Sequence, residues 1–280
     1  MSVWYQETFK GTRLSLEVTK TLFSGQSEFQ KVEIFDTKDY GRAMAIDDVF
    51  MTSERDEFFY HEMLAHPAML TAKVPPKRVL VIGGGDGGTV REVLRHPVVE
   101  ACTMIEIDEL VVRACKEHLP AIGTAWGDPR LDVRFIDGID YVKTSDDEKY
   151  DVVLLDGTDP IGPGEVLFGI EFFRGCKRML KEGGVLALQS ETPVLLPDVF
   201  FETQQKLRTL WSEVHPYFAG VPLYPSGSWS WTWCSDSGSP MDVDTAGMNA
   251  IDDGCRYYNE GIHRGAFAQP NYVKKGLAKL

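Results

Sequence analysis

The stretch Val79–His96, VLVIGGGDGGTVREVLRH, joins an apolar run to a glycine-rich loop and then to a segment of helical length. Four apolar residues in a row, rich in valine and isoleucine, indicate a buried strand. The glycines allow a sharp turn and a close approach of the backbone to a ligand before a helix that begins near Thr89. This order of strand, glycine turn and helix predicts one unit of a parallel α/β sheet.

Strand-like and helix-like segments continue to alternate after this unit. Their order favours a doubly wound parallel sheet with right-handed crossovers. A last run, Ser228–Ser235, alternates tryptophans with small residues and predicts an antiparallel strand that finishes the sheet. We therefore expect an α/β fold with a methyltransferase-like (Rossmann-type) doubly wound sheet. The other expected strands are 102–107, 131–136, 151–155 and 185–189, and two of the expected helices are 108–118 and 168–180.

The residues before this sheet follow a different pattern. Short runs such as Leu14–Val18 and Lys31–Ile34 alternate apolar and polar residues, which is typical of half-exposed strands. Ser53, followed by several acids, predicts the N-cap of a helix. We therefore expect a small antiparallel β domain over residues 1–52 and a catalytic domain over residues 53–280.

Composition narrows the classes of partner. The chain of 280 residues carries 29 Lys and Arg against 42 Asp and Glu, a net charge of −13. Such an acidic surface repels phosphate backbones and anionic lipids, so we expect neither nucleic acid nor membrane as a partner. No apolar run approaches the roughly 20 residues of a membrane-spanning helix, and the N-terminus lacks signal-peptide features. The expected location is the cytoplasm.

Acidic side chains follow four of the expected strands, and the carboxyl ends of parallel strands meet at one edge of a sheet. One of them, Glu106, follows Gly85 by about 20 residues, the spacing at which an acid binds the ribose of a nucleoside cofactor. Asp86 lies inside the glycine loop, where it would repel a pyrophosphate and suit a cationic cofactor such as a sulfonium. The alternative is a glycine turn beside exposed acids that bind nothing. The acids at this edge are Asp86, Glu106, Asp108, Asp137, Asp156 and Asp159.

The segment Asp156–Glu165 is rich in Gly and Pro, which predicts a loop that could close as a lid. Because Asp156 directly follows a buried strand, burial should raise its pKa and favour its action as a proton acceptor. Asp159 could instead cap the next helix.

Two aromatic groups could either pack in the core or line a channel for an alkyl amine. They are Tyr60 with His61, and the cluster Tyr224–Trp229. The sequence His61–His66 lacks the H-E-x-x-H spacing, and the five cysteines are scattered without a C-x-x-C pair. We therefore expect no metal site.

Taken together, several stretches make the chain resemble the spermidine synthases, a family of polyamine aminopropyltransferases. They extend over nearly the whole chain: TSERDEFFYHEML (52–64), VLVIGGGDGGTVREVLRH (79–96), MIEID (104–108), YDVVLLDGTDPIGPGEVLF (150–168), YPSG (224–227) and YYNEGIHRGAFAQPNYV (257–273).

The resemblance implies a reaction and a set of site residues. The family transfers the aminopropyl group of decarboxylated S-adenosylmethionine, a co-substrate, to a diamine and releases methylthioadenosine, without a prosthetic group. The residues implied for the nucleoside are Gln30, Glu106, Asp137, Gly138 and Pro163, and Asp86 is implied for the aminopropyl ammonium. Asp156 matches the proton acceptor. The positions that match those around the diamine are Tyr60, His61, Asp86, Asp156, Asp159 and Tyr224, with Trp4 near its far end.

The identity of the acceptor stays open at this point. Gly157 and Gln269 occupy positions where many members carry other residues. Putrescine is our first expectation, with agmatine, cadaverine or a longer polyamine as alternatives. A methyltransferase that uses S-adenosylmethionine is a second alternative, although Asp86 would repel the carboxylate of that molecule. A catalytically silent protein that binds these ligands is a third. The family forms dimers or tetramers, so we expect a homodimer or homotetramer.

Overall fold

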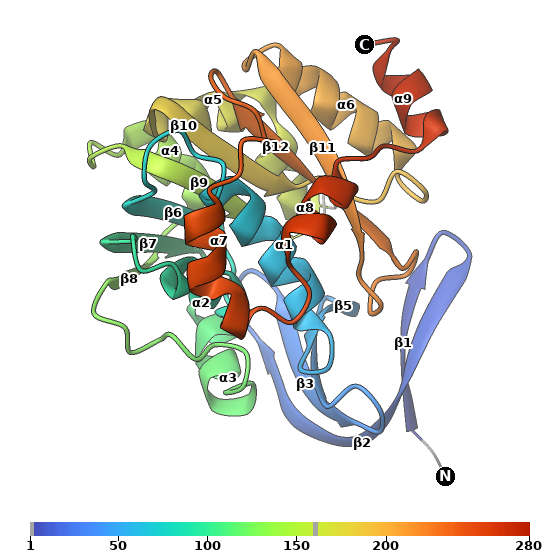
Figure 1. Cartoon of the computed structure of the whole chain (residues 1–280). Helices are drawn as coiled ribbons and strands as arrows, with labels where there is room; N and C mark the ends of the chain where they lie inside the picture. Colours follow the sequence, from blue (N-terminus) through green and yellow to red (C-terminus); the bar gives the residue numbers. More distant parts are fainter. Residues whose placement is uncertain (1–2, 159–161) are drawn as a thin grey trace.

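The computed structural model describes residues 3–158 and 162–280, and within these residues two sheets organise the chain (Figure 1). The larger sheet has seven strands in the order β11-β12-β10-β9-β6-β7-β8. Its strands β8, β7, β6, β9 and β10 are parallel, β12 runs antiparallel to them, and β11, which is antiparallel to β12, runs in their direction again. The predicted methyltransferase-like sheet is confirmed. The bounds are β6 (Arg78–Gly83), β7 (Ala101–Glu106), β8 (Leu131–Phe135), β9 (Tyr150–Asp156), β10 (Leu180–Gln189), β11 (Glu213–Gly220) and β12 (Ser228–Ser235).

One expectation about this sheet is wrong. The tryptophan-rich strand β12 is antiparallel as predicted, but it lies between β10 and β11 and does not finish the sheet. The edge strand is β11, whose sequence EVHPYFAG contains Pro216. Proline removes a hydrogen-bond donor from a strand and is therefore tolerated at the edge of a sheet. A proline within an apolar run also argues against a strand when only the sequence is considered.

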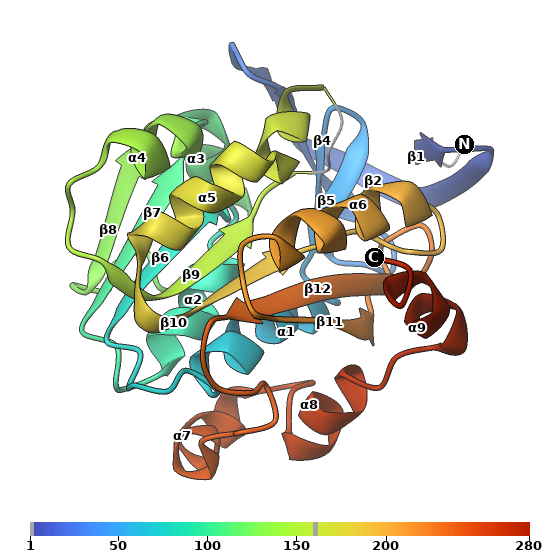
Figure 2. The ribbon, with the colours of Figure 1, turned by 90° about the horizontal axis from the view of Figure 1, so that it is seen from above.

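Helices cover both faces of the large sheet (Figure 2). On one face lie α4 (Gly138–Thr144), α5 (Ile170–Met179) and α6 (Pro197–Arg208), and on the other lie α1 (Glu57–Met69), α2 (Gly88–Arg95), α7 (Thr245–Ile251) and α8 (Glu260–Ala266). Helix α9 (Asn271–Leu277) packs on α6, and η1 (Gly162–Phe168) and η2 (Asp252–Gly254) are short 3-10 helices. None of the helices in the described part of the chain is long and apolar enough to span a bilayer.

The N-terminal strands form a separate antiparallel sheet in sequential order. They are β1 (Val3–Phe9), β2 (Thr12–Gln26), β3 (Lys31–Thr37), β4 (Arg42–Ile46) and β5 (Val49–Ser53). Helix α3 (Glu109–His118), which follows β7 of the large sheet, packs on this sheet through an apolar cluster that includes Val32, Ile34 and Val111. The predicted antiparallel unit is thus present and packs against the carboxyl edge of the larger sheet.

Helix α1 connects the two sheets and is buried on almost every side. Its acid Glu62 accepts hydrogen bonds from the backbone N–H groups of Arg256, Tyr257 and Tyr258, at 2.8, 2.9 and 2.7 Å. The helix begins at Glu57, so Ser53 does not cap it as predicted. Ser53 ends β5, and its hydroxyl donates to Asp56 at 2.6 Å.

Candidate active site

A cavity of about 710 Å³ lies between the N-terminal sheet and the carboxyl edge of the large sheet. Its volume is in the range that holds a small-molecule ligand. Acids from four strand ends reach it, as the sequence predicts. Its lining includes the predicted residues Gln30, Tyr60, His61, Asp86, Glu106, Asp137, Gly138, Asp156 and Tyr224.

The glycine loop brings the backbone of β6 close to Asp156. The N–H of Gly84 donates to the carbonyl oxygen of Asp156 at 3.0 Å. Gly83 has a φ of 84°, and a Cβ at this position would lie 2.1 Å from the same carbonyl oxygen. Any side chain at position 83 would therefore be both strained and blocked, so glycine is required there.

Asp86 is held in the glycine loop by two donors. Its Oδ1 accepts the N–H of Gly88 at 2.9 Å, and its Oδ2 lies 3.2 Å from Nε2 of His61. Burial acts to raise the pKa of Asp86, but the charge and hydrogen bond of His61, together with the N–H of Gly88 and the charge of Arg91, outweigh burial and lower it. Asp86 is therefore an anion at neutral pH, in a position to bind a cation.

Asp156 lies at the end of β9 and is half-buried at the cavity wall. Its Oδ2 accepts the hydroxyl of Thr89 at 2.6 Å. Burial, with the charge of Asp86, raises the pKa of Asp156, whereas His61 and the hydrogen bonds from Thr89 and Tyr60 act to lower it. A carboxylate with a raised pKa is suited to take a proton from an amine.

The end of the cavity that carries Glu106 is built differently. Burial raises the pKa of Glu106 to about 7 although the N–H of Asp108 donates to its Oε1 at 2.9 Å. Asp137 caps α4, since its Oδ1 accepts the N–H of Ile139 at 2.7 Å. Gln30, in the loop between β2 and β3, reaches this end and donates to Asp108 at 3.1 Å. The N-terminal segment and the large sheet thus both contribute polar groups to the same end of the cavity.

The opposite end of the cavity carries aromatic rings and two acids that do not follow the four strands with predicted acidic ends. The rings of Tyr60 and Tyr224 meet edge to face at 5.9 Å, and the Tyr224 hydroxyl donates to the carbonyl of Met51 at 3.1 Å. Glu7 from β1 and Glu191, which follows β10, also line the cavity, and both are buried. The rule that finds acids after the other parallel strands would have found Glu191 after β10.

Some implied residues lie elsewhere. Trp4 is on the other face of β1 from Glu7 and Phe9, is 53% exposed and does not line this cavity. Gln269 donates to the carbonyl of Pro216 on β11 and is not in the lining either. Asp159 lies outside the described residues. Pro163 belongs to the short 3-10 helix Gly162–Phe168, which includes the last residues of the segment expected to be a loop.

Comparisons with known proteins agree with this geometry. Residues 57–245 match the spermine/spermidine synthase domain, and residues 3–54 match the spermidine synthase tetramerisation domain. The chain is 42% identical to a polyamine aminopropyltransferase of Alkaliphilus oremlandii and 40% identical to one of Clostridioides difficile. These alignments cover 100% and 99% of this chain, and 99% of each relative.

Solved structures agree as well. A spermidine synthase in complex with the transition-state analogue AdoDATO superposes with a TM-score of 0.95 at 38% identity. The alignment covers 99% of this chain and 96% of that one. The spermidine synthase of Thermotoga maritima gives a TM-score of 0.92 at 36% identity, over 99% and 95% of the two chains. The chain therefore belongs to the spermidine synthase family and is a polyamine aminopropyltransferase.

Proposed function

We propose that this enzyme transfers the aminopropyl group of decarboxylated S-adenosylmethionine to putrescine, giving spermidine and methylthioadenosine. The observation that carries the proposal is the pair Asp86 and Asp156 at one end of the cavity, with pKa values moved in opposite directions. An anion that stays ionised suits the aminopropyl ammonium, and an acid with a raised pKa suits proton removal.

The reaction needs both groups. A protonated amine has no lone pair, so the attacking nitrogen of the acceptor must lose a proton before it displaces the thioether. Asp156 accepts that proton in this proposal. The nitrogen then forms a bond to the terminal carbon of the aminopropyl group, and the bond from this carbon to the sulfonium breaks. The electron pair stays on sulfur, which leaves neutral methylthioadenosine.

The nucleoside would occupy the other end of the cavity. In this proposal Glu106 accepts the ribose hydroxyls, and Gln30, Asp137, Gly138 and Pro163 lie around the rest of the nucleoside. Fixing the cofactor in this way would place the reacting carbon in line with the acceptor nitrogen, and orientation supplies a large part of such rate enhancements.

The residues at the far end of the cavity favour a diamine as the acceptor. Tyr60, Tyr224 and Asp156 would surround the attacking amine, together with Asp159. Two buried acids, Glu7 and Glu191, lie in the same lining and could accept the second ammonium of a diamine. A diamine with four methylenes matches apolar walls between two acidic ends, whereas a guanidinium would require a planar recess.

A panel of acceptors tests this choice. Putrescine should give the highest kcat/KM among putrescine, cadaverine, agmatine, spermidine and 1,3-diaminopropane, measured by release of methylthioadenosine. One methylene in an apolar pocket is worth about 1 to 3 kcal/mol, so cadaverine should react more slowly but not be rejected. A tenfold preference for agmatine would overturn the choice of putrescine and keep the reaction.

The methyl donor S-adenosylmethionine offers a further comparison. Asp86 should repel its carboxylate, so calorimetric titration should show tighter binding of the decarboxylated form. Tighter binding of S-adenosylmethionine would support a methyltransferase. No methylthioadenosine with any amine would support a silent binding protein.

The match to a tetramerisation domain supports a homo-oligomer, which we propose to be a dimer or a tetramer. Strand β1 is at one edge of its sheet, with exposed apolar side chains such as Val3 and Trp4. Light scattering after size-exclusion chromatography should give twice or four times the mass of the chain.

A further inference from the structure

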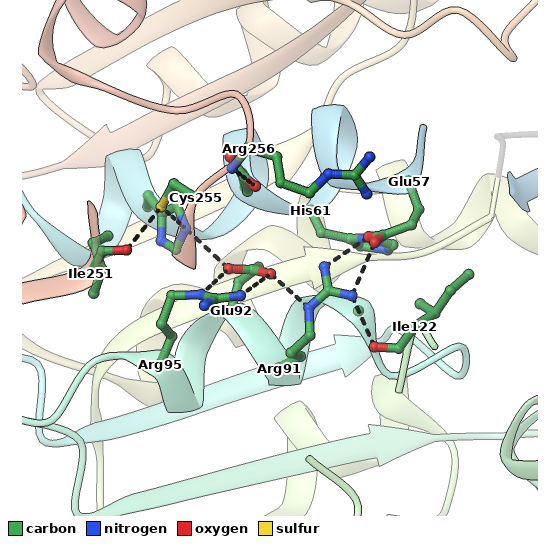
Figure 3. A network of polar contacts seen from close by, with 12 residues as sticks. Glu57, His61, Arg91, Glu92, Arg95, Ile122, Ile251, Cys255 and Arg256 are labelled. Atoms are coloured by element: carbon green, nitrogen blue, oxygen red, sulfur yellow. Dashed lines mark hydrogen bonds and ion pairs between the residues drawn. The ribbon is translucent and has the colours of Figure 1, made fainter. Parts of the chain in front are cut away.

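Buried side chains of alternating charge lead from the cavity into the interface of α1 and α2. The ring of His61 lies between two carboxylates, with Nε2 3.2 Å from Oδ2 of Asp86 and Nδ1 2.6 Å from Oε2 of Glu57. Arg91 donates to both carboxylate oxygens of Glu57, at 2.8 and 3.0 Å, and also to Glu92 at 2.7 Å (Figure 3). Among these residues, Asp86, Glu57 and His61 line the cavity.

This geometry determines where the protons are. An ionised carboxylate only accepts hydrogen bonds, so both nitrogens of the His61 ring must carry a proton to satisfy Asp86 and Glu57. A Cβ at Gly88 would lie 2.3 Å from the ring, so the start of α2 packs closely against it. Burial acts to lower the pKa of His61, but Asp86 and Glu57 outweigh burial and raise it well above its usual value. His61 is therefore an imidazolium and has no free lone pair.

We propose that Glu57, held by Arg91, is a positioning residue that keeps His61 doubly protonated, so that His61 fixes Asp86 and offsets the charge of both active-site aspartates. The inference rests on the proposed function, in which Asp86 binds the aminopropyl ammonium and Asp156 takes the proton. Asp156 is then the group that accepts the proton, and His61 is not, because an imidazolium cannot act as the base.

The charge balance in the cavity shows why this cation matters. Asp86 and Asp156 repel each other, and the charge of His61 acts to lower the pKa of both. Without that charge, Asp156 would be protonated at a higher pH and could not accept a proton near neutrality. The titratable and polar groups that act on Asp156 are Tyr60 and His61 of α1, Asp86 of the glycine loop, Thr89 of α2 and Glu106 of β7.

Glu57→Gln is the direct test. The amide has the same shape, and Arg91 keeps Glu92 and the carbonyl of Ile122 as partners. His61 then loses an anionic neighbour and releases its proton within the assay range. We expect the acid limb of kcat/KM to move to higher pH by about one unit or more, the size typical of a lost opposite charge. The ionisation of free substrate is common to both enzymes and cancels in the comparison.

Glu62→Gln is the matched control. Glu62 lies on the same helix and is also buried, but its carboxylate accepts backbone N–H groups of the C-terminal segment, and in the described part of the chain no hydrogen bond or ion pair joins it to the ring of His61. This variant should lose stability and keep the wild-type acid limb. The proposal would be overturned if the acid limb of kcat/KM lay at the same pH in Glu57→Gln and in the wild type. Equal shifts of this limb in Glu57→Gln and Glu62→Gln would overturn it as well.

A second measurement needs neither turnover nor a folded Glu57→Gln variant. With histidine labelled by ¹⁵N, the ring nitrogens of His61 should both have imidazolium shifts in the wild type at pH 8, with His61→Gln to assign the signals among six histidines. A neutral ring in the wild type would overturn the proposal. Failure of the proposed function would appear separately, as absence of methylthioadenosine from the wild type while the ring stays doubly protonated.

Discussion

The two ends of the cavity use the same residue type under opposite electrostatic conditions. At the proposed nucleoside end, Glu106 has backbone N–H donors, and burial raises its pKa to about 7. At the proposed amine end, Asp86 is as deeply enclosed, yet His61 helps to bring its pKa below the usual value. Carboxylates after parallel strands therefore do not share one role. The charge placed beside each of them decides whether it stays an anion, takes a proton or accepts neutral hydroxyls.

Asp156→Asn should have the largest effect, because it removes the proposed base from the amine end. The amide keeps the size of the side chain but cannot accept the proton of the amine. Loss of a general base costs about 10² to 10⁴ in rate. The dissociation constant of methylthioadenosine, measured by calorimetry, should change little while kcat falls. Equal losses of affinity and rate would show that Asp156 is a binding residue, with the same kind of role as the one proposed for Glu106.

Asp86→Asn should come next, and its effect should depend on the ligand. A hydrogen bond to a charged group contributes about 1.5 to 3 kcal/mol, which corresponds to roughly 10- to 150-fold in affinity. We expect this loss for decarboxylated S-adenosylmethionine, which carries the aminopropyl ammonium. Methylthioadenosine lacks that ammonium and should bind with nearly unchanged affinity. A matched loss for both ligands would contradict the assignment of Asp86 to the amine end.

The nucleoside end should respond to pH through Glu106. In the proposed role, the ionised form accepts the ribose hydroxyls, so binding should be strongest above the pKa of about 7 and weaken as the pH falls below it. Each pH unit below this value should weaken methylthioadenosine binding by up to about tenfold. Titrations between pH 5.5 and 8.5 should show this slope in the wild type and lose it in Glu106→Gln. A slope that persists in the variant would assign the ionisation to another group.

Thr89→Val should give the smallest effect. The variant keeps the shape of the side chain and removes the hydroxyl that donates to Asp156 at 2.6 Å. Because this hydrogen bond lowers the pKa of Asp156, its loss should move the acid limb of kcat/KM to higher pH. A hydrogen bond to a charged group is worth at least about 1.5 kcal/mol, and because the donor here is a neutral hydroxyl we expect the lower end, a change of about tenfold at neutral pH. An acid limb displaced to lower pH would show that the hydroxyl does not stabilise the anion.

Much of the central fold follows from local patterns. The buried strands around the glycine loop have continuous apolar runs, and the structure places them within one or two residues of the expected bounds, except that β10 begins earlier at Leu180. The edge strand β11 was missed because Pro216 interrupts it. The start of α1 was misplaced because Ser53, a good capping residue, is used in β5 and bonds to Asp56.

The site was predictable where strand ends determine it. Asp86, Glu106, Asp137 and Asp156 line one cavity because parallel strands deliver them to one edge. Glu7 reaches the cavity from a different sheet, so its place depends on how the two domains pack. The partnership of His61 with Glu57 depends on side-chain direction in α1, four residues apart, and on the position of Asp86 across the cavity. Spacing alone does not show such partners.

The buried helix α1 also limits how the length of this chain can vary. Only residues 54–56 separate the end of β5 from the start of α1. One inserted residue would turn every side chain of the helix by about 100°, which would take Tyr60 and His61 from the cavity and Glu62 from the C-terminal segment. Insertions and deletions should therefore be excluded from this connection and tolerated in surface turns such as that between β1 and β2, where the space around Gly11 is open.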